Sequence, residues 1–233
     1  MALPKIDLPI FELTLPSSGE KIKYRPFTVK EEKILLVAKE SGDSEQEIVA
    51  TKQIANNCLI DKDVSDMAMF DFEYILLVLR SRSVDNEINF SVKDPETDES
   101  IPLTLDIDCI KLKTYPSHSK EVKINDDYTL YLKYPSIDQF ISIGKMDTKD
   151  PLANYYIMVS CLDKVASEDE VHDFKDYTQE DIDSFMENLS GDVINGIKNF
   201  FETMPKLRHE LKYKNNLGHE KTFVLEGIKS FFI

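Results

Sequence analysis

The chain has 233 residues, of which 43 are acidic and 28 are lysine or arginine, and its formal net charge at pH 7 is −15. Hydrophobic residues make up 42% of the sequence, which is enough for the core of one large domain or two small ones. No run of about 18 apolar residues occurs, so we expect no membrane-spanning helix. The first residues lack a basic segment followed by a long apolar stretch, so we also expect no secretory signal.

The acidity bears on the class of partner. Binding to nucleic-acid phosphates requires a basic surface, and the sequence has no basic stripe, so we expect no nucleic-acid binding. Lysines and arginines are interleaved with the acids, as in residues 30–33 (KEEK), which dilutes any phosphate-like array. A solvated acidic surface is therefore favoured over a nucleic-acid mimic.

A β-hairpin is predicted for residues 11–26. Polar and apolar residues alternate at 12–15 and again at 21–24, and the sequence Pro-Ser-Ser-Gly at 16–19 is typical of a turn. Pro26 ends the second strand because proline has no N–H to donate to a sheet.

Two capped helices are predicted to follow this hairpin. Thr28 and Glu31 have the Thr-x-x-Glu spacing of a capping box, so the first helix begins after Thr28, and Gly42 ends it. Ser44 and Glu47 have the same kind of spacing, which predicts that Ser44 caps the second helix. Its expected inward-facing residues follow helical spacing: Ile48, Thr51, Ala55, Cys58 and Leu59.

A buried helix and a second hairpin complete the first half. An acidic loop at 61–66 leads to residues 70–84, which are apolar nearly all round from Tyr74 to Leu79 and are therefore predicted to form a buried helix. Alternation at 87–92 and at 101–107 indicates two strands joined by a turn. Residues 111–120 are polar and lose this periodicity, so we place the boundary between the two halves there.

The second half starts with a predicted hairpin at 120–135. Ser136 and Gln139 then form a capping box for a short helix that reaches Gly144. The later predicted elements are a helix at 152–166 opened by Pro151, a helical region from Thr178 to Phe201 with Gly191 or Gly196 as a break, a hairpin at 207–227, and a short terminal helix or strand at 228–232.

The two halves have a similar order of elements. Tyr24–Thr28 corresponds to Tyr134–Ser136 at an offset of 110 residues, and Asn57–Leu59 corresponds to Ser160–Leu162 at an offset of 103. These close offsets suggest an internal duplication, with chance similarity of a common pattern as the alternative.

We therefore expect an α+β fold in which antiparallel hairpins pack with helices. The expected lobes are residues 1–113 and 114–233, which would be similar to each other if the duplication is real.

The search for chemistry is mostly negative. No phosphate-binding loop, nucleophile elbow or zinc-protease motif occurs. His209 and His219 should lie on the two arms of the last hairpin, with His219 facing Lys214 and His209 near Val224, too far apart to share a metal ion. The other histidines are His118 and His172. We expect no catalytic, cofactor-binding or metal-binding residues.

For an acidic run and for the three cysteines we favour a structural role over a chemical one. The acidic run Glu168–Glu170 is expected to be a solvated loop and not an acid–base site. Cys58, Cys109 and Cys161 are far apart in apolar sequence and are expected to be buried, reduced thiols. An inter-chain disulfide or a reactive thiol is the alternative.

Three segments are candidates for binding another protein. The extended arm at 1–10, with prolines at positions 4 and 9, could add a strand to a partner, or could be a loosely packed terminus. Residues 80–83 (RSRS) either hold an acidic partner or end a helix, and the helix end is favoured. The apolar stretches 223–225 and 231–233 either complete the core or dock to another chain, and the core is favoured.

These residues also resemble a known family. Leu15–Gly19, Tyr24–Phe27 and Lys30–Lys33 form a turn, a Tyr-Arg-Pro-Phe junction and a Lys-Glu-Glu-Lys helix. Asp71–Tyr74 and Arg80–Val84 begin and end a later helix. This series is similar to the baseplate hub and tail-assembly proteins of T-even-like contractile-tailed bacteriophages. The match covers roughly residues 3–90, and the rest of the chain agrees in its pattern of elements.

The resemblance implies a non-enzymatic, protein-binding role in assembling the baseplate hub, as a hub component or as an assembly chaperone. It implies hub or tape-measure proteins as partners, leaves self-association open, and places the protein in the host cytoplasm during assembly or in the virion baseplate. Some relatives carry a cysteine-bearing knuckle near the final hairpin, where this chain has Asn215–Gly218, so no metal role is carried over. The alternatives are an acidic inhibitor of a host enzyme and a phage hydrolase with an unrecognised site.

Overall fold

The computed structural model describes residues 7–84, 86–144 and 153–227. Within them the chain is an α+β mixture of seven helices and twelve antiparallel strands, as predicted. The helices are α1 (Val29–Ser41), α2 (Ser44–Cys58), α3 (Met69–Ser83), α4 (Ile137–Gly144), α5 (Ala153–Ser160), α6 (Gln179–Glu187) and α7 (Gly191–Thr203). No helix among these residues has the length and apolar character needed to cross a membrane.

The strands form four sheets, in the orders β1-β2-β3, β4-β5, β12-β11-β6 and β10-β9-β8-β7. Their bounds are β1 (Phe11–Thr14), β2 (Lys21–Tyr24), β3 (Leu59–Ile60), β4 (Glu87–Lys93), β5 (Ser100–Asp106), β6 (Lys111–Lys113), β7 (Glu121–Lys123), β8 (Thr129–Leu132), β9 (Leu162–Ala166), β10 (Val171–Asp173), β11 (Lys206–Lys214) and β12 (Glu220–Glu226).

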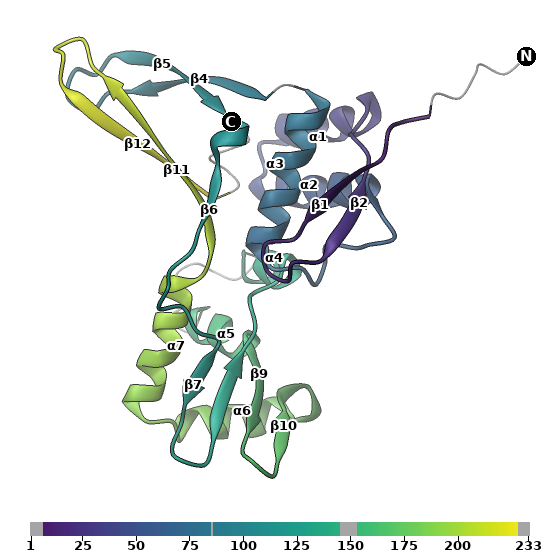
Figure 1. Cartoon of the computed structure of the whole chain (residues 1–233), viewed down its shortest axis with the longest axis vertical. Coiled ribbons are helices and arrows are strands. Elements are labelled where there is room, and N and C mark those ends of the chain that lie inside the picture. The colour runs from purple at the N-terminus through teal and green to yellow at the C-terminus, as the bar shows by residue number, and fades with distance from the viewer. Residues whose placement is uncertain (1–6, 85, 145–152, 228–233) are drawn as a thin grey trace, which may run out of the picture. The chain divides into compact units, whose positions relative to one another are not determined.

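The chain divides into two compact units (Figure 1). The larger unit comprises residues 1–113 and 206–233, and the smaller unit comprises 114–205. The predicted second lobe was residues 114–233, whereas the final hairpin, β11–β12, groups with residues 1–113 in the larger unit. β11 pairs with β6, with Leu207 opposite Leu112, and Leu207 and Leu225 are buried in the core of the larger unit.

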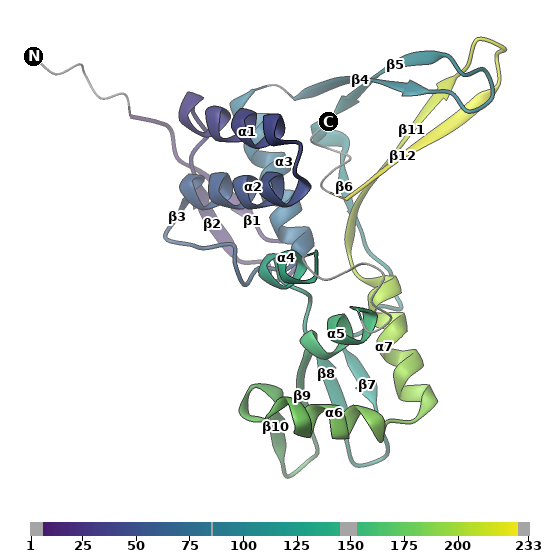
Figure 2. The same cartoon turned by 180° about the vertical axis from the view of Figure 1, so that it is seen from behind.

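In the larger unit, hairpin β1–β2 lies on one side of helices α1 and α2 (Figures 1 and 2). Helix α1 follows its predicted limits, with Thr28 as the N-cap in a capping box and Gly42 in the left-handed conformation at the C-cap. Helix α2 is capped by Asp43 and not by Ser44, because the Asp43 carboxylate accepts the hydrogen bond from the Glu45 N–H at 2.9 Å.

A buried carboxylate ties these elements together. Glu31, with a fully buried side chain, accepts hydrogen bonds from the Thr28 N–H at 2.9 Å and from the Arg25 guanidinium at 3.0 Å. Arg25 also reaches the Cys58 sulfur at 3.8 Å, and its own N–H donates to the Cys58 carbonyl at 2.9 Å. The end of β2, the start of α1 and the end of α2 therefore meet at one ion pair.

The predicted buried helix is α3. Its buried residues include Phe72, Ile75, Leu76 and Leu79. Asp71, in its first turn, accepts hydrogen bonds from the N–H and hydroxyl of Ser17 in the β1–β2 turn. The turn is thereby fixed to the helix start.

Two hairpins of the larger unit meet near their ends (Figure 1). Asp94, fully buried after β4, accepts hydrogen bonds from the Tyr213 hydroxyl at 2.8 Å and from the N–H groups of Glu96 and Thr97 at 3.0 Å. Burial alone would raise the pKa of Asp94, but these hydrogen bonds lower it to about 2. A charged, fully hydrogen-bonded carboxylate thus joins β4–β5 to β11–β12.

The smaller unit packs helices on one face of a four-stranded sheet (Figure 2). Its core is formed by inward side chains of the strands and of α6 and α7: Val122, Leu130, Leu132, Leu162, Val165, Met186, Val193, Ile197 and Phe200. Ser136 and Gln139 form the predicted capping box of α4, since each backbone N–H donates to the other's side chain. Pro151 and residues 228–232 lie outside the described residues.

One prediction for this unit was wrong. The predicted helix at 152–166 ends at Ser160, because Leu162–Ala166 pairs with β8 on one side and β10 on the other. The predicted break in the helical region 178–201 is present: α6 ends at Glu187 and α7 begins at Gly191, with the Ser190 hydroxyl as its cap. Of the two glycines offered for the break, Gly191 stands at it and Gly196 lies within α7.

Both units contain a hairpin, two helices and a strand that pairs with the second hairpin strand. A hydrogen bond recurs at equivalent places: Arg25 N–H to the Cys58 carbonyl at 2.9 Å, and Lys133 N–H to the Cys161 carbonyl at 2.8 Å. Internal duplication stays a hypothesis, which this recurrence supports.

The first prediction concerns Glu31. Burial would raise its pKa, but hydrogen bonds from Arg25 and Thr28 outweigh burial and lower it from 4.5 to about 2. Because the folded-state pKa is depressed, this stabilisation is complete above pH 4.5 and is lost as the pH falls toward 2. Glu31→Gln should therefore lower the free energy of unfolding by about 2 kcal/mol at neutral pH, by leaving Arg25 without its ionic partner.

Urea unfolding followed by circular dichroism at several pH values measures this effect. The gap between the wild type and Glu31→Gln should close in acid, whereas a gap independent of pH would contradict the role of the charge. Glu32→Gln, at the exposed neighbouring position, is the matched control and should change stability by less than about 0.5 kcal/mol.

The second prediction concerns Gly196, where a Cβ atom would lie 2.6 Å from Cγ1 of Val122. Gly196→Ala should destabilise the protein, because a clash with a buried branched side chain costs about 1–3 kcal/mol and outweighs the gain of about 1 kcal/mol in helix propensity. Gly191→Ala, where the new Cβ would meet nothing within 4 Å, should cause no loss.

A double-mutant cycle with Val122→Ala separates the clash from other effects. The double variant should lose less stability than the two single variants added together, because removing the Val122 methyl groups makes room for the new Cβ. Strict additivity in urea unfolding would show that the close approach does not matter.

Candidate functional site

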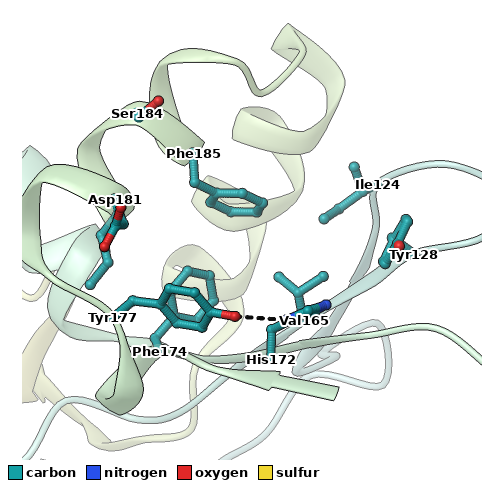
Figure 3. A pocket seen from close by; sticks show the side chains of 10 residues that line it. Ile124, Tyr128, Val165, His172, Phe174, Tyr177, Asp181, Ser184 and Phe185 are labelled. Atoms are coloured by element: carbon teal, nitrogen blue, oxygen red, sulfur yellow. Dashed lines mark hydrogen bonds between the residues drawn. The ribbon is translucent and has the colours of Figure 1, made fainter. Parts of the chain in front are cut away.

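The smaller unit contains an apolar pocket of about 410 Å³ (Figure 3). It lies between the β7–β8 turn, strands β9 and β10, and helix α6. Its lining residues are Ile124, Tyr128, Val165, His172, Phe174, Tyr177, Asp181, Ile182, Ser184 and Phe185. Most of these side chains are aliphatic or aromatic, which is typical of a site that receives an apolar group.

Local capping places the aromatic rings. Asp173 accepts a hydrogen bond from the Lys175 N–H at 3.1 Å, which starts the short 3₁₀ turn Phe174–Asp176. Thr178 then caps α6 and sets Phe185 against Phe174, with ring centroids 5.3 Å apart in an edge-to-face arrangement. The pocket wall therefore follows from two consecutive caps in a stretch of fewer than twenty residues.

The polar groups of the pocket are engaged with neighbouring side chains. The Nδ1 atom of His172 lies 2.7 Å from the Tyr177 hydroxyl (Figure 3). The Nε2 atom of the same ring lies 3.2 Å from the Glu170 carboxylate. Asp181 accepts hydrogen bonds from the Thr178 N–H and hydroxyl, which lower its pKa. These contacts hold the fold of the segment and place no nucleophile beside a base.

A second apolar surface lies on α1 and α2 of the larger unit. Val29, Leu36 and Val37 are 55–69% exposed, and Val49 of α2 is 46% exposed. Beside them is a groove of about 180 Å³, whose apolar lining includes Phe27, Leu35, Leu36, Ile54, Leu76 and Leu79. We call the exposed side chains of Val29, Leu36, Val37 and Val49 the α1 face. Clustered exposed aliphatic side chains of this kind mark binding surfaces.

The histidines outside the pocket have structural neighbours. His118 lies between the Thr203 hydroxyl at 2.9 Å and the Tyr134 hydroxyl at 3.0 Å, and burial lowers its pKa. His219 contacts Glu96 at 3.0 Å, and His209 pairs with Leu225.

The predicted register of the final hairpin was wrong by one residue: Lys214 pairs with Glu220 and not with His219. Within the described part of the chain, no three histidine, cysteine or acidic side chains are grouped as a metal site would require.

The cysteine prediction was wrong for one residue. Cys58 and Cys161 are buried free thiols, and burial raises the pKa of each to about 11. Cys109 is an exposed free thiol, because it ends the short 3₁₀ turn after β5, where its side chain faces solvent. A hydrogen bond to Asp106 raises the Cys109 pKa, so the thiol form is favoured.

The structure describes residues 80–83 and 223–225 of the predicted binding segments, and residues 7–10 of the N-terminal arm. Residues 80–83 end α3, where the Ser83 hydroxyl accepts from the Phe27 N–H at 2.9 Å and Arg82 lies over the Phe11 ring at 5.7 Å. In the final hairpin, Leu225 is buried, and the ring of Phe223 packs on that of Phe90 with 5.8 Å between the ring centroids. The segment 231–233 and residues 1–6 lie outside the described residues, and Ile10 is 61% exposed.

The pocket was not predicted from the sequence, because its lining comes from three separate segments. One signal was available in residues 171–177 (VHDFKDY), where two aromatic residues stand three positions apart in an acidic stretch. Solvated loops seldom need two large rings, so this spacing favours a packed turn.

Comparison with known proteins gives a family. No curated protein and no solved structure matches the chain. The family described as T4 bacteriophage base plate protein has a model that matches residues 8–233, nearly the whole chain. The protein therefore belongs to the T4 bacteriophage base plate protein family.

Proposed function

We propose that this protein binds other phage proteins in the central hub of the tail baseplate, as a hub subunit or as an assembly chaperone, and that it does so without catalysis. Membership of the baseplate family supports the location. The observation that carries the proposal is the apolar pocket. Its histidine and tyrosine contact each other, its Asp181 accepts from Thr178, and hydrophobic walls are left for a partner.

The α1 face supports the same role from the larger unit. Side chains such as Leu36 (55% exposed) and Val37 (69% exposed) cost little where they stand and gain free energy when another protein covers them. Two apolar surfaces suit a protein that contacts more than one neighbour or holds a subunit before incorporation.

The test is affinity capture of a tagged copy from infected cells, alongside the protein content of purified virions, both by mass spectrometry. Hub proteins in the capture together with absence from virions would indicate a chaperone, and presence in both would indicate a hub subunit. Capture of host enzymes alone, or of nothing specific, would contradict the proposal.

A paired substitution on the α1 face sharpens this test. Leu36→Glu with Val37→Glu should reduce the captured hub protein at least tenfold, because two charges would have to be desolvated in the interface. Leu217→Glu, at a side chain 62% exposed in the last hairpin, is the matched control and should leave capture unchanged. Equal capture by all three proteins would exclude the α1 face from the interface.

The N-terminal arm gives a further prediction. We expect deletion of residues 1–10 to abolish capture of the hub or tape-measure partner and to leave the fold intact, since this segment precedes β1. Circular dichroism and urea unfolding check the fold. Unchanged capture would contradict a role for the arm.

A further inference from the structure

The segment that supplies most of the pocket lining in the smaller unit is strongly acidic. Residues 162–187, which form β9, β10, the 3₁₀ turn and α6, contain ten acidic residues and two lysines. Both lysines are engaged within the unit: Lys175 forms an ion pair with Asp173 at 2.5 Å, and Lys164 lies over the Tyr131 ring at 5.1 Å. This segment therefore carries a formal excess of eight negative charges, and we call its exposed acids the acidic rim.

The position of these acids matters more than their number. Glu170, Asp176 and Glu180 are exposed and lie next in sequence or one residue removed from the lining residues His172, Tyr177 and Asp181. These exposed acids flank the lining residues in the sequence, whereas Val165, Phe174 and Phe185 give the pocket apolar walls (Figure 3). Apolar walls with exposed acids beside them are complementary to an apolar side chain flanked by cations.

We propose that this pocket receives an apolar side chain from a lysine- or arginine-rich segment of a partner protein. The inference rests on the proposed function and specifies the chemistry of one partner. The volume of about 410 Å³ lies within the range of about 300–1,000 Å³ that ligand pockets occupy. The acidic rim attracts a basic segment and speeds its association, and it repels acidic surfaces and nucleic acid.

The chain contains no tryptophan, which permits a direct test with a tryptophan-bearing peptide. The probe is the synthetic peptide Lys-Lys-Leu-Trp-Lys-Lys, titrated with the purified full chain. We expect a saturable blue shift of the indole emission as the ring leaves water. Raising the salt concentration should weaken binding, because it screens exposed charges.

Two further peptides test each half of the proposal. Glu-Glu-Leu-Trp-Glu-Glu keeps the apolar centre and reverses the charge, so its binding should be at least tenfold weaker. Lys-Lys-Ala-Ala-Lys-Lys keeps the charge and lacks the apolar centre, so it should not displace the probe. Equal binding of the glutamate peptide, or the absence of any blue shift with the lysine probe, would overturn the proposal.

Substitutions locate the site. Tyr177→Ala should weaken probe binding at least fivefold, and Tyr177→Phe, which keeps the ring and loses only the hydroxyl, should retain it. Asp176→Asn with Glu180→Gln alters exposed side chains, so it tests the rim even where Tyr177→Ala fails to fold, and it should weaken binding and reduce its salt dependence. Sensitivity to Leu36→Ala instead would place the probe on the α1 face and overturn the assignment.

Sedimentation of the chain alone tests the other occupant, a second copy. Self-association that Tyr177→Ala abolishes would overturn the proposal in favour of a dimer contact. The peptide assay uses no other phage protein, so its failure would overturn this inference alone. The proposed baseplate role is tested separately by the capture experiment.

Discussion

The fold of the larger unit depends on one buried ion pair, between Arg25 and Glu31. A carboxylate without exposed surface requires a cation and N–H donors, and the hairpin and the α1 cap supply both. Arg25 is positioned because its backbone is bonded to Cys58, where α2 ends and β3 begins. Loss of the Arg25–Glu31 ion pair, of the Thr28 N–H bond to Glu31 or of the backbone bond from Arg25 to Cys58 would leave the charge of Glu31 uncompensated. The positions of the hairpin, α1 and α2 therefore depend on one another at this junction.

In the smaller unit, a neutral side chain joins the start of the first helix to the end of the second, where the larger unit uses the charged Glu31. At the position equivalent to Glu31 in the capping box stands Gln139, whose amide oxygen accepts from the Ser136 N–H. Its amide nitrogen donates to the Ser160 carbonyl at 2.8 Å, at the end of α5. One neutral side chain thus joins the start of the first helix to the end of the second. Because an amide needs no counter-ion, this junction has no arginine and should be insensitive to acid.

Prediction from the sequence succeeds or fails according to the range of the interactions. The caps at Thr28 and Ser136 were predicted because each is complete within four residues. The fate of Leu162–Ala166 was missed, since its neighbours in the sheet, and not its own residues, make it a strand. The final hairpin was placed in the wrong unit for the same reason, as its pairing with β6 joins distant parts of the chain. The pocket was missed because its lining comes from three segments, and the aromatic spacing in residues 171–177 indicates only a packed turn.

The acidic residues of the pocket segment fall into two groups, those that stabilise its fold and those that folding does not require. Asp173 and Asp181 cap turns, and Asp183 accepts a hydrogen bond from the Tyr155 hydroxyl at 2.6 Å, so these carboxylates maintain the segment. Exposed acids such as Glu180 stand where a surface ion pair would contribute little to folding, and their mutual repulsion opposes compaction. This charge density is not required for folding, and it lies in the segment whose apolar side chains leave the pocket uncovered. Both features support the proposal that the pocket contacts another protein.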